Sequence, residues 1–220
     1  MQPEIQLIKQ SVLNPERIIW KDWEFIRGRL NGREIVAVQT GVGKVLAALV
    51  TQKLIDMFEP SAIIMTGIAG AISPDLHRGD IVLGTDCLQH DMDATLFGFK
   101  RGQIPYTDYR IVESDTALVE AAMSYTKEQL KTGRILTGDQ FISGAGDDEF
   151  SYLTEELEGD VVEMEGAAAG LTAQVNEIPF LLIRVISDKA DGQAKGSYKK
   201  FLSSASERSF HLIEYLLAVV

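Results

Sequence analysis

Short runs of apolar residues alternate along the chain with longer segments in which apolar residues recur every three or four positions. The first pattern is typical of β-strands and the second of amphipathic α-helices. Strands are predicted at 34–40, 62–67, 79–88, 134–139, 160–165 and 179–188. Helices are predicted within 41–58, 113–130, 166–174 and 197–219, and Pro3 opens a further helix at the start of the chain.

The order of these elements predicts an α/β protein. Strands that are apolar along nearly their whole length and are separated by helices indicate a mainly parallel sheet that is covered on both faces. The 220 residues contain no linker, internal repeat or low-complexity tract, so we expect residues 1–220 to form one domain. We also expect Ser114 to cap the helix predicted at 113–130, and the polar segment 188–198 to form a loop.

The composition narrows the range of partners and compartments. A formal charge of −11 repels phosphate backbones and anionic lipid surfaces, which argues against nucleic acid or a membrane as a partner. The single cysteine, Cys87, excludes an intramolecular disulfide, and the three histidines are too scattered for a zinc motif. No apolar run approaches the roughly 20 residues of a membrane span, and the start lacks the features of a signal peptide, so we expect a cytoplasmic protein.

Chemistry-bearing residues gather where the predicted strands end. In open α/β sheets, ligands bind in a crevice outside the carboxyl ends of the strands. At those ends lie TGIAG (66–70), GDQF (138–141), EME (163–165) and ISD (186–188). We therefore expect these segments, with their glycines, acids and one aromatic ring, to meet at one edge of the sheet.

The acids themselves leave alternatives open. Asp188 is suited either to cap a helix or to donate a proton to a ligand. Glu163 and Glu165 are two residues apart, so in an extended strand they point to one face and repel each other unless something bridges them. A sugar diol is one such bridging partner, while Glu165 is equally suited to the positive end of the following helix. The usual role of an acid at the position of Glu4, in the first turn of a helix, is to stabilise the helix through its negative charge, which interacts favourably with the helix dipole.

Two further segments carry weaker signals. TGVGKV (40–45) lacks the spacing of a phosphate-binding loop, which favours a tight turn that begins a helix. HDMDATLFGF (90–99) has one histidine and two aspartates, which is weak support for a metal site. An ordered loop whose aromatic rings serve an interface or a ligand is the favoured interpretation.

Five blocks taken together carry a resemblance to a known family. They are TGVGKV (40–45), HDMDATLFGFKRGQIP (90–105), TGDQFISG (137–144), VEMEGAA (162–168) and ISDKAD (186–191), in this order over nearly the whole chain. The sequence resembles the nucleoside phosphorylase and nucleosidase superfamily, and within it the bacterial 5′-methylthioadenosine/S-adenosylhomocysteine nucleosidases. The resemblance implies a three-layer α/β/α fold around a mixed, partly barrel-like sheet, a homodimer, and hydrolysis of the bond between adenine and ribose. It implies no metal and no organic cofactor.

The resemblance also implies which residues carry the reaction. Asp188, steadied by Ser187, would protonate adenine N7, and Glu4 would activate the attacking water with help from Arg184. These roles agree with the chemistry, because departure of adenine leaves an oxocarbenium-like sugar and requires an acid on the leaving group and a base on water.

The substrate contacts are implied in the same way. Glu165 would hold the ribose hydroxyls with Met164 packed against the sugar, while Phe141 would stack on the base and the main chain of Ile142 would read its edge. The other implied contacts are Glu163 at the edge of the site, Ile68, Ala69 and Gly70 beside base and ribose, Val42, Tyr198, and Phe97 and Pro105 over the ligand of the partner subunit.

The chain departs from the family's pattern at two places. Family members begin with a hydrophobic strand that ends in Gly-Ala-Met before the catalytic glutamate, whereas this chain starts at that Met. We therefore expect that the first strand is absent or the start truncated, which would leave Glu4 near a mobile terminus. Ile68 stands where many relatives have serine, so one hydroxyl near the ribose is lost.

Three rival functions stay open. A phosphate-dependent purine nucleoside phosphorylase would want arginines beside the glycine-rich turns, and the turns at 41–43 and 67–70 carry none. A futalosine-type nucleosidase differs only in substrate. A catalytically inactive protein that binds adenine nucleosides is favoured by the missing first strand.

Overall fold

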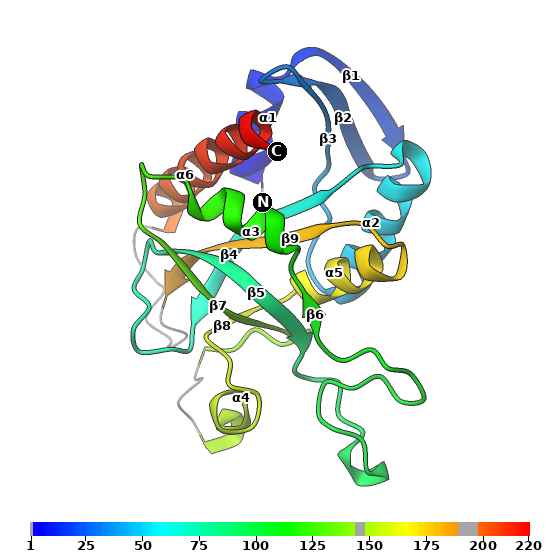
Figure 1. Ribbon diagram of the computed structural model, residues 1–220, viewed down its shortest axis with the longest axis vertical. Helices are drawn as coiled ribbons and strands as arrows, with labels where there is room; N and C mark the ends of the chain where they lie inside the picture. The colour runs from blue at the N-terminus through cyan, green and yellow to red at the C-terminus, as the bar shows by residue number, and fades with distance from the viewer. Residues whose placement is uncertain (1, 144–147, 189–197) are drawn as a thin grey trace.

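A six-stranded sheet forms the centre of the structure (Figure 1). The structure is a computed structural model that describes residues 2–143, 148–188 and 198–220. At residues 2–4 and 198–200 it describes only the backbone. The strands of the sheet run in the order β6-β5-β7-β8-β4-β9, and β5 also pairs with β9, so that the sheet closes on itself like a small barrel. The strands are β4 (Ile63–Ala71), β5 (Ile81–Gln89), β6 (Val112–Glu113), β7 (Leu130–Thr137), β8 (Val161–Glu163) and β9 (Phe180–Asp188).

The sheet is mixed rather than mainly parallel. β4 pairs with β9, β5 with β7, and β7 with β8 in parallel, while β4–β8, β5–β9 and β5–β6 are antiparallel. The prediction of a mainly parallel sheet is therefore wrong for half of the pairs. The cause is closure of the sheet, because β5 folds back onto β9 with Ile81 opposite Val185, and the short β8 joins β4 with Val162 opposite Gly70.

A second, antiparallel sheet of three strands precedes the central one. It consists of β1 (Leu13–Trp20), β2 (Trp23–Leu30) and β3 (Arg33–Ala37), of which the sequence pattern predicted only the third. β1 is mostly exposed, so it carries no apolar run to mark it. A signal was present in the turn Asn31-Gly32, where both residues have positive φ (51° and 81°), because Asn-Gly is typical of two-residue hairpins.

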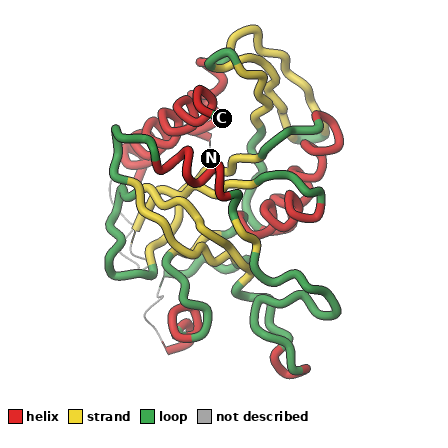
Figure 2. The backbone as a smooth tube through the Cα atoms, in the orientation of Figure 1, coloured by secondary structure: helices red, strands yellow, loops and turns green. Residues whose placement is uncertain are grey.

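Helices cover the central sheet on two sides, as Figures 1 and 2 show. α5 packs on the sheet with α2 against it, and α3 and α6 cover the other side with α1 along α6. The helices are α1 (Gln2–Ser11), α2 (Lys44–Phe58), α3 (Thr116–Met123), α4 (Tyr152–Glu155), α5 (Gly166–Val175) and α6 (Tyr198–Val219), with short 3₁₀ turns η1 (Thr95–Phe97) and η2 (Asp148–Phe150). The expected three-layer α/β/α fold is thus confirmed.

Alternation along the strands explains why helices are needed on both sides. On β5, Ile81 and Leu83 face the cluster formed with α3 and α6, whereas Val82 between them faces the cluster formed with α5. Successive side chains of a strand point to opposite faces, so a strand that is apolar throughout must be covered twice. Small residues bring α5 close to the sheet: a Cβ on Gly170 would lie 2.8 Å from the Phe180 ring.

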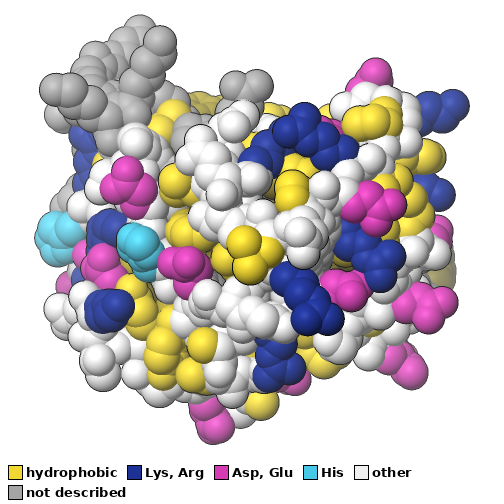
Figure 3. Space-filling model, turned by 90° about the horizontal axis from the view of Figure 1, so that it is seen from above, with side chains coloured by type: hydrophobic (Ala, Val, Ile, Leu, Met, Phe, Trp, Pro, Cys, Tyr) yellow, Lys and Arg dark blue, Asp and Glu magenta, His cyan; other side chains and the backbone are white. Residues whose placement is uncertain are grey.

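The outer surface carries mixed charge. On the face seen from above in Figure 3, acidic and basic side chains are interspersed, with apolar groups between them. No helix in the described part of the chain is both long and apolar enough to cross a bilayer.

The helix predicted at 113–130 is shorter than expected and has a different cap. α3 begins at Thr116, and the Oδ1 atom of Asp115 accepts a hydrogen bond of 2.9 Å from Leu118 N, while Ser114 makes no such side-chain bond. From Leu130 onward the chain already belongs to β7. The prediction that Ser114 caps this helix is therefore wrong, because the next residue supplies a better placed carboxylate.

We predict that Asp115→Ala lowers the free energy of unfolding by about 1 kcal/mol, because it leaves an amide at the start of α3 without its acceptor. Ser114→Ala is the matched control and should change stability by less than about 0.5 kcal/mol. Urea unfolding followed by circular dichroism measures both. Equal losses in the two variants would contradict the assignment of the cap.

Candidate active site

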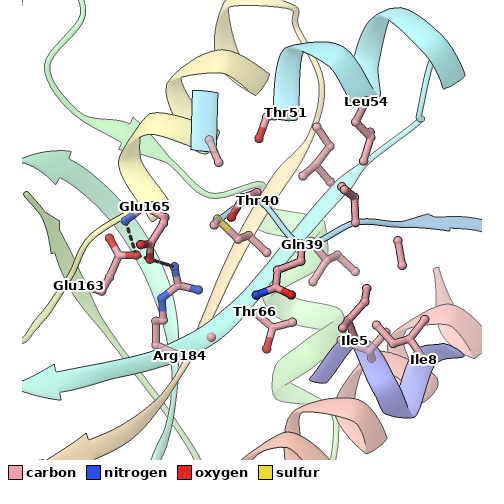
Figure 4. Close-up of a pocket in the computed structure, with 18 of the residues that line it drawn as sticks. Ile5, Ile8, Gln39, Thr40, Thr51, Leu54, Thr66, Glu163, Glu165 and Arg184 are labelled. Atoms are coloured by element: carbon pink, nitrogen blue, oxygen red, sulfur yellow. Dashed lines mark hydrogen bonds and ion pairs between the residues drawn. The ribbon is translucent and has the colours of Figure 1, made fainter. Parts of the chain in front are cut away.

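A cavity of about 1050 Å³ lies at the edge of the central sheet, and most residues predicted for the site line it. Its walls come from the ends of β4, β8 and β9, from the segment before α2 and from the segment after β7 (Figure 4). The predicted residues in these walls are Val42, Ile68, Ala69, Gly70, Phe141, Ile142, Glu163, Met164, Glu165, Arg184, Ser187 and Asp188. The structure thus brings together the strand ends that the sequence singled out.

Glu163, the last residue of β8, is buried and uses its carboxylate inside the protein. Both oxygens lie within 3 Å of Gly166 N, and Oε2 also accepts a hydrogen bond from Glu165 N at 3.0 Å. Oε1 accepts a further hydrogen bond from the hydroxyl of Thr137 at the end of β7. Glu163 therefore caps the amino end of α5, where backbone N–H groups have no partners within the helix.

Arg184 resolves the repulsion between the two glutamates. Its side chain is 1% exposed, its Nη2 atom donates to Oε2 of Glu163, and the same Nη2 lies 3.9 Å from Oε2 of Glu165. Figure 4 shows both carboxylates beside this guanidinium. The neighbouring strand leaves room for it, because a Cβ on Gly67 would lie 2.9 Å from Nη1 of Arg184. A protein cation therefore bridges the pair for which the sequence had suggested a sugar diol.

Glu165 stands at the first position before α5, yet its side chain does not cap that helix. Its Oε1 atom accepts a hydrogen bond of 2.9 Å from Gly43 N, in the turn before α2. Burial raises the pKa of the Glu165 carboxyl above its ordinary value, and the negative charge of Glu163 raises the pKa further. Arg184 and the hydrogen bond from Gly43 N lower the pKa, but by less in total. The second oxygen, Oε2, faces Arg184 in the wall of the cavity.

Asp188 and Ser187 lie at the end of β9. The Ser187 hydroxyl is 2.5 Å from Oδ1 of Asp188 and 3.1 Å from the carbonyl oxygen of Ala69 on β4. The Ser187 hydroxyl therefore links the Asp188 carboxylate to β4 and fixes its position at the edge of the cavity.

Hydrogen bonds link three segments at the rim, through residues that lie in motifs quoted from the sequence but had no role assigned in the predicted site. Lys44 Nζ donates to Oδ1 of Asp91 at 2.6 Å, Lys44 N donates to Oδ1 of Asp139 at 2.8 Å, and Asp139 N donates to Oδ2 of Asp91 at 2.9 Å. TGVGKV does form a turn that begins a helix, with Gly41 and Gly43 at positive φ. Asp91 pairs with a lysine, and no group of potential metal ligands occurs in the part of the chain described.

Comparison with known proteins identifies the family of this chain. Residues 1–218 match the sequence profile of the Phosphorylase superfamily. The chain belongs to this superfamily. It is 36% identical to the 5′-methylthioadenosine/S-adenosylhomocysteine nucleosidase of Staphylococcus haemolyticus over 222 residues, covering 100% of this chain and 97% of the relative. It is 37% identical to the nucleosidase of the same name from Halalkalibacterium halodurans over 228 residues, covering 100% and 94%.

Solved structures of superfamily members share the fold. The nucleosidase of Neisseria meningitidis in complex with methylthio-immucillin-A matches with a TM-score of 0.92 and 32% identity, over 100% of this chain and 96% of that one. A futalosine hydrolase mutant of Helicobacter pylori matches with a TM-score of 0.92 and 27% identity, again over 100% and 96%.

Four residues implied by the resemblance to the superfamily lie away from the cavity or outside the described parts. Phe97, on η1, is 77% exposed and, like Pro105, does not line the cavity. The side chains of Glu4 and Tyr198 lie outside the described residues, although their backbones belong to α1 and α6. Ile5, next to Glu4, lines the cavity. Of the predicted loop 188–198, residues 189–197 lie outside the described residues, while its two end residues belong to β9 and α6.

The cavity continues past the carboxylates between β3 and β4. In the described part of the chain, β3 pairs only with β2, and from Ile63 to Ala69 β4 pairs only with β9, so the facing edges of β3 and β4 have no strand between them. Apolar side chains line this part, among them Ile8, Leu54 and Leu217. The first element in the described part of the chain is α1.

Proposed function

We propose that this protein is a purine nucleosidase that hydrolyses the N-glycosidic bond of 5′-methylthioadenosine and S-adenosylhomocysteine, releasing adenine and the 5-thioribose product. The observation that carries the proposal is the shared cavity, in which Asp188 with Ser187 faces the same space as Glu165 with Met164. The names of the relatives and the inhibitor complex of the Neisseria enzyme support the same substrate class.

Asp188 is the proton donor in this mechanism. It transfers its proton to N7 of adenine, so the base leaves as a neutral molecule and the bond to ribose breaks. The Ser187 hydroxyl, which is within hydrogen-bond distance of both Oδ1 of Asp188 and the carbonyl oxygen of Ala69, orients the carboxyl. General acids of this kind typically contribute on the order of 10²–10⁴ in rate.

Glu165 binds the sugar. With Oε1 held by Gly43 N, its Oε2 remains to accept hydrogen bonds from the ribose hydroxyls, while Met164 packs against the ring. The negative charge also stabilises the oxocarbenium-like sugar that forms as adenine departs. Glu4 activates the attacking water, assisted by Arg184. No step uses a metal or an organic cofactor.

The base lies between the rim and the sheet edge. Phe141, which is 75% exposed at the rim, stacks on adenine, and the main chain of Ile142 reads the edge of the base. The other contacts are made by Ile68, Ala69 and Gly70 on β4, by Val42, and by Tyr198.

Water is favoured over phosphate as the nucleophile. The arginine nearest the sugar position, Arg184, already pairs with Glu163, and Glu165 beside it would repel an anion. Futalosine is kept as a second candidate substrate because a futalosine hydrolase shares the fold at 27% identity.

Adenine release tests the reaction directly. We predict that 5′-methylthioadenosine is hydrolysed at the same rate with and without phosphate. Chromatography of released adenine measures this rate, and the same assay with futalosine compares the two substrates.

Asp188→Asn should lower kcat by about 10²–10⁴ while the dissociation constant for the nucleoside changes by less than about tenfold. Asp75→Asn, which replaces an exposed aspartate that does not line the cavity, is the control and should leave both unchanged. Strict dependence on phosphate, or full activity of Asp188→Asn, would contradict the proposal.

The pH profile tests Glu165. Its pKa is raised above the ordinary value near 4.5, and only the ionised form accepts both ribose hydroxyls. We therefore predict that kcat/KM falls as the pH decreases through this raised pKa, so that the acid limb lies above pH 4.5. Glu165→Gln should lack this limb, whereas the exposed Glu207→Gln should keep it. A limb that persists unchanged in Glu165→Gln would assign the titration to another group.

We further propose that the 220 residues act as one domain in a cytoplasmic homodimer, with Phe97 and Pro105 reaching the ligand of the partner subunit. Exposed apolar side chains support a dimer: Val45 and Leu49 project from α2, and Phe97 is 77% exposed on the loop. Val45 and Leu49 are four residues apart and so lie on one face of α2, and contiguous exposed apolar faces mark interaction sites.

Sedimentation velocity tests the dimer. We expect the wild type to sediment as a dimer and the double variant Val45→Glu/Leu49→Glu to dissociate, because buried charges without partners disfavour association. Ile19→Glu replaces another exposed apolar residue, on β1, and is the control. A monomeric wild type at micromolar concentration would overturn the dimer without affecting the proposed reaction at Asp188.

A further inference from the structure

The carboxylate of Glu163 has no free site for a substrate. A carboxylate offers about four lone-pair positions. Those of Glu163 face the Thr137 hydroxyl, Glu165 N, Gly166 N and Arg184 Nη2, and the side chain is 1% exposed. Although Glu163 borders the cavity, a ribose hydroxyl could bind it only by displacing one of these internal donors. This geometry therefore argues against the substrate contact at Glu163 that the resemblance implied.

Arg184 interacts more directly with Glu163 than with Glu165. Arg184 is hydrogen-bonded to Glu163 but stands 3.9 Å from Oε2 of Glu165, beyond hydrogen-bond distance. Among the described residues, the charged groups that face Glu165 are Arg184 on β9 and Glu163 on β8, and the turn before α2 adds the N–H of Gly43. Among these described groups, the cation donates its hydrogen bond to Glu163 and not to Glu165.

From this geometry, and resting on the proposed function, we infer that Glu163 is a positioning residue that holds Arg184 away from Glu165 and keeps the Glu165 carboxylate available to the ribose. It does so while fixing the first turn of α5, through bonds to Glu165 N and Gly166 N. Glu163 thus sets both where the sugar-binding carboxylate stands and how much of its charge a protein cation neutralises.

The alternative is a purely structural role as a helix cap. The two roles differ in what happens to Arg184 when Glu163 loses its charge. A guanidinium that loses its hydrogen bond to Glu163 still has the Glu165 carboxylate 3.9 Å away, and a small movement toward it forms a charge-assisted hydrogen bond. Glu165 would then be engaged by Arg184. A cap alone has no such consequence.

Glu163→Gln tests the inference. We expect kcat/KM for 5′-methylthioadenosine to fall by roughly tenfold to a hundredfold, mainly through KM, because the ribose competes with Arg184 for Glu165. We also expect the acid limb of the kcat/KM profile to move to lower pH. Loss of the neighbouring negative charge and approach of Arg184 both lower the pKa of Glu165, so it stays ionised further into acid.

Thr137→Val is the matched control. It removes a hydrogen bond from the same carboxylate without changing any charge, so it should lower the melting temperature but leave the acid limb where it is in the wild type. If Glu163→Gln behaves like Thr137→Val, with lower stability and an unmoved limb, Glu163 is only a cap and the inference is wrong.

Glu163→Asp decides the case if the glutamine variant does not fold. It keeps the charge but shortens the side chain, so we expect a lower kcat/KM with the acid limb close to that of the wild type. Wild-type kinetics in Glu163→Asp would overturn the inference. Absence of turnover in the wild-type protein would instead refute the proposed function, so the two failures are distinguishable.

Discussion

The site depends on one buried ion pair, between Glu163 at the end of β8 and Arg184 in the middle of β9. Removing two charges from water is costly, and the cost is offset only when the pair has good geometry and additional hydrogen bonds. Here the additional bonds come from Thr137 and from the first amides of α5. The pair therefore joins three strands and a helix at the place where the sugar is proposed to bind.

Closure of the central sheet makes this arrangement possible. Because β9 pairs with both β4 and β5, its end carries Ser187 and Asp188 to the carbonyl of Ala69, while β8 brings Glu163 and Glu165 to the same edge. The proposed acid thus stands at the end of β9, and the proposed sugar ligand stands at the junction between β8 and α5. The rim, in contrast, is built from loops that Lys44, Asp91 and Asp139 tie together.

Local sequence patterns predicted what local physics determines. The apolar strands 62–67 and 179–188 and the helix after Gly166 were predicted because burial on both faces leaves a continuous apolar run. β1 was not predicted because its side chains are mostly exposed. The antiparallel pairing of β5 with β9 was not predicted because no local pattern encodes which distant strands meet. The strand-end rule gathered the site residues, but the bridge at Arg184 depends on a contact across 21 residues that only the fold reveals.

A crystal structure with an adenosine analogue whose glycosidic bond is stable would test the central claim most directly. The account predicts ribose hydroxyls on Oε2 of Glu165, N7 of the purine beside Asp188, and Arg184 still bonded to Glu163. A ribose bound to Glu163, or a purine that lies away from Asp188, would contradict it.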